Sequence, residues 1–441
     1  MKKVLILAYD FPPYVSVGGL RPYSWYKYFH DFGIYPIVIT RQWGNKYGNH
    51  LDYIAPGESN ETIIEESETG TIIRTPYKPN LSNRLLLKYG EKRFRILRKA
   101  ITAWYEFMQF LFFVGPKACL YRGAKSYLKN HKVDAILATG EPFILFKYAS
   151  KLSRKLNIPW VADYRDPWTQ SIARSKNYLQ KKWNAYFEGR YLKSVTGVVA
   201  VSNLLALKIL DKAQQKPFLI AQNGFDNELL ILERKKQSSD VLNIAFAGSL
   251  YPWHPVAKFL QVLSEFIETY QSKIQFNFVG INKKEQIEQL INEQFPSLVN
   301  RVVFHPRMSN KALFQYLVTQ NLLLLFNDYS ISGTKIYDYL VAKRRILLCF
   351  TNDGEAFKLK EKHFTIDDSR IKGHDLQAEI ITHTHSGYLV ENPVQLLNLL
   401  NSLYLEFNEQ GALPCNSKNI RKFSRKKQTE KLVDFLINTT V

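Results

Sequence analysis

The fold of this chain is decided by the stretch Ser332-Gly333-Thr334-Lys335-Ile336-Tyr337-Asp338-Tyr339-Leu340. An apolar run at residues 322–326 and a polar loop at 327–330 precede it, and a second apolar run at 345–350 follows it. This order predicts a strand, a loop, a helix and a strand, which together form one parallel α/β unit. Ser332, Gly333 and Thr334 favour the start of a helix.

Lys335 and Asp338 are three residues apart, so they share one face of the predicted helix. The loop and the helix start would lie beyond the carboxyl end of a strand, where open α/β sheets bind ligands. A lysine at a helix N-terminus suits a phosphate, and a carboxylate one turn later can accept hydrogen bonds from a ribose diol. The segment therefore predicts a clamp for a nucleoside diphosphate, although its spacing alone also fits a solvated helical face.

The composition predicts a large folded protein in a reducing compartment. A length of 441 residues indicates two or three domains, and a hydrophobic content of 46% excludes a chain that is disordered throughout. The three cysteines, Cys119, Cys349 and Cys415, lie far apart without CxxC spacing. We therefore expect no disulfide framework, no cysteine metal site and a cytoplasmic location.

The N-terminus predicts a buried strand, because its apolar run is short and Asp10 and Pro12 soon follow it. No apolar run approaches the roughly 20 residues that a membrane span needs. The net charge of +21 indicates an anionic partner, which could be nucleic acid, anionic lipid or a phosphorylated substrate. No signature of a common nucleic-acid-binding domain is present, so we expect no nucleic-acid partner.

The first half of the chain predicts alternating strands and helices. A strand at residues 4–8 leads into a loop with Gly18, Gly19 and Arg21, followed by a helix at 23–32. This opening is Rossmann-like but lacks GxGxxG, so it gives little support to a dinucleotide site. The two glycines could let the backbone approach a ligand, or they could form a flexible turn.

Polar residues follow two further predicted strands of this half. The strand at residues 133–138 runs into Thr139, Gly140 and Glu141, and another strand ends before Asp163, Arg165 and Asp166. Charged groups at such strand ends usually face a ligand cleft, which makes these residues candidates for the site. The alternative is that Arg165 and Asp166 form a structural ion pair.

The second half repeats the alternation after a polar region at residues 211–240. Its first strand, at 242–247, runs into Gly248 and Ser249. We therefore predict an α/β protein with two doubly wound, Rossmann-like domains facing a central cleft. The predicted domains are residues 1–215, completed by a C-terminal helix at 420–441, and residues 216–419. The ligand site is expected where the strand ends face each other.

Residues 84–132 combine positive charge with aromatic groups. Twelve basic residues stand against two acidic ones, which is a local excess of ten, and large apolar residues such as Trp104, Phe112 and Phe113 lie between them. A basic, aromatic pair of helices can lie in a membrane interface. The alternative is a pair of amphipathic helices packed on the sheet with their lysines in water.

Several motifs occur along the chain in an order and with a spacing that are typical of one enzyme family. They are Tyr9-Asp10-Phe11-Pro12-Pro13, Gly18-Gly19-Leu20-Arg21-Pro22, Ala162-Asp163-Tyr164-Arg165-Asp166-Pro167-Trp168, Val201-Ser202, Asn223-Gly224-Phe225-Asp226, Phe246-Ala247-Gly248-Ser249-Leu250 and Gly333-Thr334-Lys335-Ile336-Tyr337-Asp338-Tyr339-Leu340. Over nearly its full length, the chain resembles the GT-B glycosyltransferases. It is most similar to the large retaining family usually numbered four, also called group 1.

The resemblance implies a nucleotide-sugar donor, UDP- or GDP-linked, held mainly by the C-terminal domain without a metal ion. It implies that Lys335 meets the diphosphate, that Asp338 binds the ribose, and that Gly248 lets the backbone approach the donor. The expected donor-binding residues are Gly18, Gly19, Arg21, Gly248, Ser249, Gly333, Thr334, Lys335 and Asp338. The expected catalytic residues are Arg165, Asp166 and Lys335, and the expected acceptor residues are Thr139, Gly140 and Glu141.

The chain departs from the family pattern at several positions. Asp338 replaces a glutamate, and Ser330 stands where the first glutamate of the Glu-x7-Glu motif is usual. Tyr251-Pro252-Trp253-His254 occupies the place of an arginine and a lysine, and Phe146 or Lys147 that of a histidine.

We therefore expect a hexosyltransferase that is peripheral on the inner face of the cell membrane and contacts it through residues 84–132. Its expected acceptor is a lipid-linked or saccharide precursor of a surface polysaccharide such as lipopolysaccharide or capsule. The alternatives are a nucleotide-sugar epimerase and a catalytically silent GT-B subunit of a polysaccharide assembly.

Overall fold

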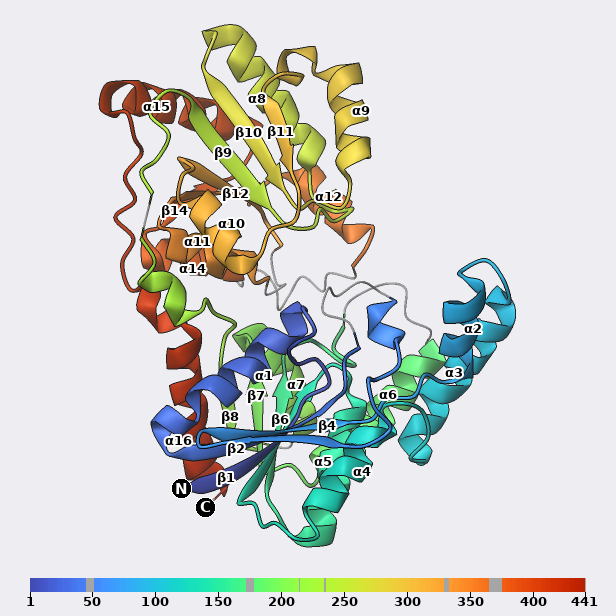
Figure 1. The fold of residues 1–441 in the computed structure, drawn as a ribbon. Coiled ribbons are helices and arrows are strands. Elements are labelled where there is room, and N and C mark those ends of the chain that lie inside the picture. Colours follow the sequence, from blue (N-terminus) through green and yellow to red (C-terminus); the bar gives the residue numbers. More distant parts are fainter. Residues whose placement is uncertain are drawn as a thin grey trace. The chain divides into compact units, whose positions relative to one another are not determined.

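The computed structural model describes residues 1–44, 51–171, 178–213, 215–233, 235–328, 333–364 and 375–440. The chain divides into two compact units (Figure 1). Unit 1 contains residues 1–171, 176–222 and 425–441, and unit 2 contains residues 223–424.

Unit 1 is built on an eight-stranded sheet. In spatial order its strands are β3 (Ile63–Ser67), β4 (Gly70–Thr75), β2 (Ile34–Arg41), β1 (Lys2–Leu7), β5 (Ala135–Gly140), β6 (Trp160–Tyr164), β7 (Gly197–Ala200) and β8 (Phe218–Ile220). Neighbouring strands are parallel except for the antiparallel pair β3 and β4. The strand order reverses between β1 and β5, so the ligand-binding point expected of such a sheet lies at their carboxyl ends.

Helices cover both faces of this sheet. One face packs against α1 (Val17–Tyr28) and α16 (Arg425–Thr440). The other packs against α4 (Ala118–Tyr127), α5 (Ile144–Leu156), α6 (Tyr178–Leu192) and α7 (Asn203–Ala213). Within β1, Val4 and Ile6 enter the first core while Leu5 and Leu7 enter the second. Burial on both faces explains why the strand is continuously apolar rather than alternating.

A helical hairpin of α2 (Leu81–Tyr89) and α3 (Arg95–Leu111) extends from the edge of unit 1 (Figure 1). Within the hairpin, the Ser82 hydroxyl donates to the carbonyl of Arg98 at 3.0 Å. The ammonium of Lys147, on α5, donates to the carbonyls of Gln109 and Phe112 at 2.7 Å each and thereby satisfies the C-terminal end of α3. Residues 84–132 thus form three helices rather than the predicted pair, and α4 is the one whose buried face packs on the sheet.

Unit 2 is built on a six-stranded, all-parallel sheet. Its spatial order is β11 (Val302–His305), β10 (Ile274–Val279), β9 (Leu242–Ala247), β12 (Leu322–Phe326), β13 (Arg345–Cys349) and β14 (Gly387–Val390). Counted along the chain, this is the order 3-2-1-4-5-6 of nucleotide-binding Rossmann folds. The order reverses between β9 and β12.

The helices of unit 2 also lie on two faces. One core contains residues of α8 (Val256–Tyr270), α9 (Lys284–Gln294), α12 (Gly354–Glu361) and α15 (Pro393–Gln410). The other contains residues of α10 (Asn310–Leu317), α11 (Lys335–Ala342) and α14 (Leu376–Thr384). Short 3-10 turns complete the two units at His30–Phe32, Asp52–Ile54, Asn227–Leu230, Pro296–Leu298 and Ile420–Phe423. The prediction of two doubly wound, Rossmann-like domains is confirmed.

The division between the units lies a few residues beyond the predicted boundary at residue 215. The strand β8 pairs with β7, so residues 218–220 belong to the first sheet. The last helix, α16, returns to unit 1 and packs against α1, where the ammonium of Lys426 lies 2.6 Å from a carboxylate oxygen of Asp31.

A buried ion pair ties three segments of unit 1 together. The guanidinium of Arg21, on α1, donates to the carboxylate of Asp163, on β6, with three contacts of 2.7 to 3.1 Å. It also donates to the carbonyl of Ala221 at 2.7 Å, and the hydroxyl of Thr139 donates to Asp163 at 2.8 Å. Every acceptor in this group is inside unit 1, and the Asp163 side chain is fully buried.

We predict that Asp163→Ala lowers the free energy of unfolding by about 3–5 kcal/mol, because it leaves the Arg21 guanidinium buried without its counter-charge. Denaturant unfolding followed by tryptophan fluorescence measures the loss. The control is Glu288→Ala, which removes the exposed partner of Lys284 and should change stability by less than about 0.5 kcal/mol. Equal losses in the two variants would contradict a structural role for the buried pair.

Candidate functional site

The carboxyl ends of β9 and β12 gather groups that are distant in sequence. Gly248 and Ser249 follow β9 directly, Asp328 follows β12, and α11 begins at Lys335. The ammonium of Lys335 donates to the carbonyl of Ser249 at 2.9 Å. The structure therefore joins two of the predicted motifs at the point where the strand order of unit 2 reverses.

The side chain of Lys335 crosses directly over Gly248. A Cβ atom at Gly248 would lie 2.7 Å from Cε of Lys335, and the φ angle of Gly248 is +97°. The positive φ angle favours glycine there, and a Cβ atom would also force the end of the Lys335 side chain to move. The Lys335 ammonium also lies 4.5 Å from the centre of the Phe246 ring, and no described carboxylate is within ion-pair distance of it. Burial lowers the pKa of Lys335 to about 8, against the opposing effect of Asp328.

Asp328 is the centre of a polar cluster beside this lysine. One of its carboxylate oxygens accepts from the indole N–H of Trp253 at 3.0 Å and lies 3.2 Å from Nε2 of His254. Nδ1 of His254 accepts from the backbone N–H of Tyr251 at 3.4 Å, so Nε2 carries the proton of the neutral ring. Burial lowers the pKa of His254. Burial acts to raise the pKa of Asp328, but the contacts of His254 and Trp253 outweigh it and hold that pKa below its usual value.

A second buried lysine reaches the same edge from α12. Lys360 is almost completely buried, and its ammonium donates to the carbonyl of Asp328. Burial lowers its pKa to about 8, while Asp328 and Asp375 act in the opposite direction. Asp375 caps α14 and accepts from the side-chain amide of Asn327 at 2.6 Å. Lys335 and Lys360 thus place two cations at this edge, beside the carboxylates of Asp328 and Asp375.

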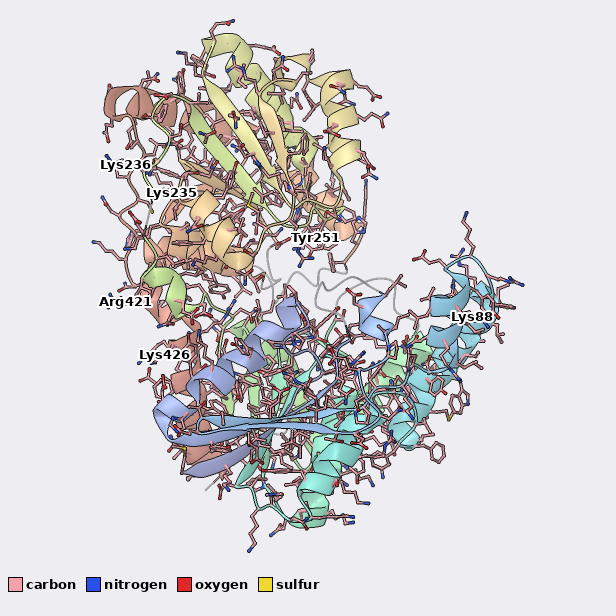
Figure 2. All side chains as sticks on the ribbon, in the orientation of Figure 1. Lys88, Lys235, Lys236, Tyr251, Arg421 and Lys426 are labelled. Atoms are coloured by element: carbon pink, nitrogen blue, oxygen red, sulfur yellow. The ribbon has the colours of Figure 1, made fainter. Side chains whose placement is uncertain are left out.

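An aromatic pair occupies the place where the family pattern has an arginine and a lysine. The rings of Tyr251 and Trp253 stack in parallel with their centres 4.6 Å apart. Tyr251 projects from the end of unit 2 at which β9 terminates (Figure 2), and 42% of it is exposed. The Lys335 ammonium is 5.8 Å from the centre of its ring. The pair offers a flat surface next to the lysine.

In unit 1, charged groups gather at the carboxyl ends of β1, β5 and β6. Nη2 of Arg165 donates to the carbonyl of Glu141 at 2.9 Å and lies 3.6 Å from a carboxylate oxygen of Asp10. Nε of Arg165 is 3.4 Å from the carboxylate of Asp166. A Cβ atom at Gly18 would lie 1.7 Å from the Arg165 guanidinium, so a side chain at Gly18 would displace this arginine.

Asp10 is the most enclosed carboxylate of this group. It is about nine-tenths buried, and the Ser16 hydroxyl donates to its Oδ2 at 2.9 Å. Its Oδ1 has no hydrogen-bond partner among the described residues. Burial raises the pKa of Asp10, although Arg165 acts to lower it. An unpaired buried oxygen is costly unless a ligand or water donates to it, so Oδ1 is a candidate acceptor for a ligand hydroxyl.

The loop that carries Arg165 and Asp166 is anchored from below by Glu188. Its fully buried carboxylate accepts from the hydroxyl of Tyr164 at 2.9 Å and from the side-chain amide of Gln170 at 2.8 Å. It also accepts from Thr169 and pairs with the ammonium of Lys212 at 2.6 Å. Both ends of the loop are thus fixed to one buried anion, which holds Arg165 in position.

The structure brings many of the predicted residues into two groups. Gly248, Ser249 and Lys335 are together in unit 2, with Gly333 and Thr334 before the helix and Asp338 one turn on. Gly18, Glu141, Arg165 and Asp166 are together in unit 1. Arg21 and Thr139 are engaged by Asp163 as described above, and Gly140 is the last residue of β5. Their roles in binding stay predictions.

Two local expectations differ from the structure. Gly18 and Gly19 are not in a loop but in the first turn of α1, which begins at Val17 because the Ser16 hydroxyl accepts from the N–H of Gly19 at 3.1 Å. Thr334 has helical φ and ψ angles of −94° and −20°, so its side chain makes no capping bond. Ser330 and Ser332 lie outside the described residues.

Several groups of the two sites were not predicted. Asp10 and Asp328 each follow a buried strand closely, so their positions at strand ends were a usable signal. Lys117 directly precedes α4 and Lys360 lies in α12, and nothing in their sequence neighbourhood marks them. The Lys117 ammonium lies 5.9 Å from the centre of the Tyr9 ring, and burial lowers its pKa.

Within the described residues, no three His, Cys, Asp or Glu side chains cluster as metal ligands would. In the same part of the chain, every helix is too short or too polar to cross a bilayer.

The sequence matches no protein-family model and no curated protein, but solved structures resemble the fold. Sucrose-phosphate synthase from Thermosynechococcus elongatus has a TM-score of 0.61 at 14% identity, with 99% of each chain covered. WaaG, a glycosyltransferase involved in lipopolysaccharide biosynthesis, has a TM-score of 0.56 at 14% identity, covering 98% of this chain and 99% of WaaG. HepE from Anabaena, solved in complex with UDP and glucose, has a TM-score of 0.56 at 12% identity, covering 99% of this chain and 100% of HepE.

At these identities the likeness shows the fold. The sucrose-phosphate synthase and WaaG are glycosyltransferases of the GT-B type, and this chain shares their architecture of two Rossmann-like domains. The predicted fold class is therefore confirmed.

We predict that Gly248→Ala lowers the free energy of unfolding by about 1–3 kcal/mol, because alanine is strained at this φ angle and meets the Lys335 side chain. Gly354→Ala is the control: Gly354 begins α12 in open space, so alanine there should be neutral or stabilising by up to about 1 kcal/mol. Denaturant unfolding compares the two variants. A Gly248→Ala protein as stable as the Gly354→Ala protein would contradict the described path of Lys335.

Proposed function

We propose that this protein is a glycosyltransferase that moves a sugar from a nucleotide-sugar donor to a saccharide acceptor. The observation that carries the proposal is the position of Lys335. This partly buried cation crosses over Gly248 at the point where the strand order of unit 2 reverses. Open α/β sheets bind nucleotides at this point. The GT-B architecture supports the same function, since the HepE structure holds UDP and glucose and a structure from E. coli holds UDP-2-fluoro glucose.

In the proposed reaction, the bond between the anomeric carbon and the diphosphate oxygen breaks as the acceptor oxygen bonds to that carbon. The acceptor hydroxyl proton leaves on the diphosphate. Negative charge grows on the leaving diphosphate, so a cation aimed at it stabilises the transition state more than the ground state. Lys335 would supply this charge, and Asp338, one helical turn away, would accept hydrogen bonds from the ribose.

We assign the acceptor to the carboxyl edge of the unit 1 sheet. Oδ1 of Asp10 would accept a hydrogen bond from a saccharide hydroxyl, and Arg165 would hold Asp10 and the neighbouring Glu141 in place. The finer parts of the proposal are transfer of a hexose with retention at the anomeric carbon, a UDP- or GDP-linked donor, and no metal ion. The proposed product is a lipid-linked or surface-polysaccharide precursor, such as one for lipopolysaccharide or capsule.

We further propose that the enzyme works on the inner face of the cell membrane. Its contact would be the hairpin surface, defined as the exposed side chains of Lys88, Lys92, Arg93, Arg95, Ile96, Leu97, Lys99 and Trp104 on α2, α3 and their connection. Ile96 is 86% exposed, and Lys88 projects outward from α2 (Figure 2). Exposed apolar groups among cations match an anionic lipid surface.

We predict that UDP or GDP raises the melting temperature of the protein and that Lys335→Ala weakens this binding by about 10- to 100-fold, the range for loss of a charge-assisted hydrogen bond. Lys311→Ala, which removes an exposed lysine of α10, is the control and should bind normally. Unchanged nucleotide affinity in Lys335→Ala would refute the donor site. Donor hydrolysis without acceptor would separate an enzyme from a silent subunit that only binds the nucleotide.

The same titration has an expected pH dependence. Between pH 7 and pH 9 Asp328 stays ionised and His254 stays neutral, whereas Lys335 and Lys360 lose their protons near pH 8. Nucleotide affinity should therefore decrease as the pH rises through about 8. Lys335→Arg keeps its charge over this range, so it should flatten the decrease.

We predict that vesicles containing phosphatidylglycerol sediment the protein and that Ile96→Ser combined with Trp104→Ser weakens this binding about tenfold or more, because two apolar groups no longer enter the interface. Val394→Ser, at an exposed apolar position on α15 in unit 2, is the control. Binding should also weaken with added salt. If the double variant and the control sediment alike, the hairpin surface is not the membrane contact.

A further inference from the structure

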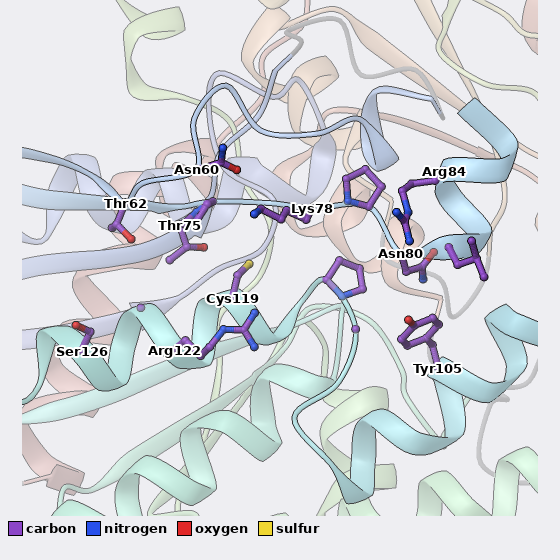
Figure 3. Close-up of a pocket in the computed structure, with 16 residues that line it drawn as sticks. Asn60, Thr62, Thr75, Lys78, Asn80, Arg84, Tyr105, Cys119, Arg122 and Ser126 are labelled. Atoms are coloured by element: carbon purple, nitrogen blue, oxygen red, sulfur yellow. The ribbon is translucent and has the colours of Figure 1, made fainter. Parts of the chain in front are cut away.

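A cavity of about 640 Å³ opens in unit 1, apart from the carboxyl-edge groups described above. Its walls come from α4, the segment after β4, the start of α2 and the middle of α3 (Figure 3). All of its lining residues belong to unit 1 and are described. The volume is in the range of protein sites for small ligands.

Three cations from three different segments line this cavity. Lys78 comes from the segment after β4, Arg84 from α2 and Arg122 from α4, and Figure 3 shows them around the same hollow. The lining contains no aspartate or glutamate. None of the three cations has an ion-pair partner in the part of the chain that the structure describes. Three unpaired cations without a counter-charge favour an anionic ligand.

The remaining walls offer neutral polar groups and rigid backbone. Side-chain amides and hydroxyls come from Asn60, Thr62, Asn80, Tyr105 and Ser126. Pro76, Pro79 and Pro116 limit the flexibility of the walls. Cys119 lies in the cavity wall, but burial raises the pKa of its thiol, which keeps it neutral and unreactive. Many hydroxyl and amide groups around a few cations suit a ligand that carries both hydroxyls and an anion.

We propose that this cavity binds a saccharide unit that carries an anionic group, either a phosphate or a carboxylate. The cations would hold the anion, and the amides and hydroxyls would bind the sugar hydroxyls. The binding claim stands on the cavity alone. The further claim that this saccharide is part of the acceptor rests on the proposed glycosyl transfer.

The neighbours of the cavity support its role as an acceptor subsite. Pro116 in its wall is followed directly by Lys117, whose ammonium lies over the Tyr9 ring next to Asp10. Arg84 and Tyr105 in the opposite wall belong to the α2–α3 hairpin. A bound saccharide would thus extend between the hairpin surface and the carboxyl edge that holds Asp10. An acceptor anchored in a membrane would need such a path from the membrane contact to the carboxyl edge.

Four probes test the site by ligand-observed NMR titration: a disaccharide ending in glucuronic acid, glucose 6-phosphate, the neutral disaccharide maltose, and inorganic phosphate. We expect at least one charged sugar to bind about tenfold or more tightly than maltose and inorganic phosphate. Only a charged sugar can contact the cations with its anion and the amides and hydroxyls with its sugar hydroxyls. The preferred charged sugar identifies the anion as carboxylate or phosphate.

Arg122→Gln should weaken the preferred charged sugar about tenfold. Lys125→Gln is the matched control, because Lys125 is an exposed cation on the same helix outside the cavity lining. Both substitutions are at exposed positions, so the fold should be retained. Equal losses in the two variants would overturn the proposal. It would also be overturned if neither charged sugar bound more tightly than both maltose and inorganic phosphate.

Failure of this site can be distinguished from failure of the donor site. Arg122→Gln should keep the UDP-induced melting shift, and Lys335→Ala should keep charged-sugar binding. Transfer to an anionic acceptor should show a raised KM in Arg122→Gln with kcat nearly unchanged, because a binding contact is lost and the reacting groups remain. A kcat loss without a KM change would overturn the acceptor assignment.

Discussion

Reversal of strand order in a parallel sheet is the constraint on which both proposed sites depend. Right-handed crossovers place successive helices on opposite faces once the order reverses, so the two loops beside the reversal separate and leave room at the carboxyl edge. In unit 2 this room is between β9 and β12, where Lys335 crosses Gly248. In unit 1 it is between β1 and β5, where Asp10 and Glu141 meet Arg165. The position of each proposed site therefore follows from the strand topology and not from particular side chains.

Buried charges then hold the loops of unit 1 in position. Arg21 and Asp163 connect α1 with β6, and Glu188 collects four donors beneath the loop after β6. Lys147 satisfies the last carbonyls of α3. Each ion is compensated by several hydrogen bonds, which a buried charge needs in a medium of low dielectric constant. The result is a rigid support under groups such as Asp10, whose buried Oδ1 has no hydrogen-bond partner among the described residues.

The sequence was sufficient to predict the two doubly wound sheets, because strands buried on both faces leave long apolar runs and glycine-containing loops punctuate them. It also located Lys335, Gly248 and Arg165 at strand ends. It could not predict the start of α1, since a helix that has two glycines in its first turn and contains Pro22 depends on the cap from Ser16. Lys117, just before α4, and Lys360, in α12, were also missed, because tertiary packing alone brings them to the carboxyl edges.

The return of α16 to unit 1 has a consequence for how the protein is made. Leu432, Val433 and Leu436 cover the same apolar face as Trp25 and Phe29, so the first sheet lacks part of its covering until the last helix has left the ribosome. Unit 2 is in effect an insertion within unit 1, and its own strands are complete earlier in synthesis. This apolar face of the first sheet therefore stays partly uncovered while about 200 further residues are translated. A chaperone that binds it during this period would protect the nascent chain from aggregation.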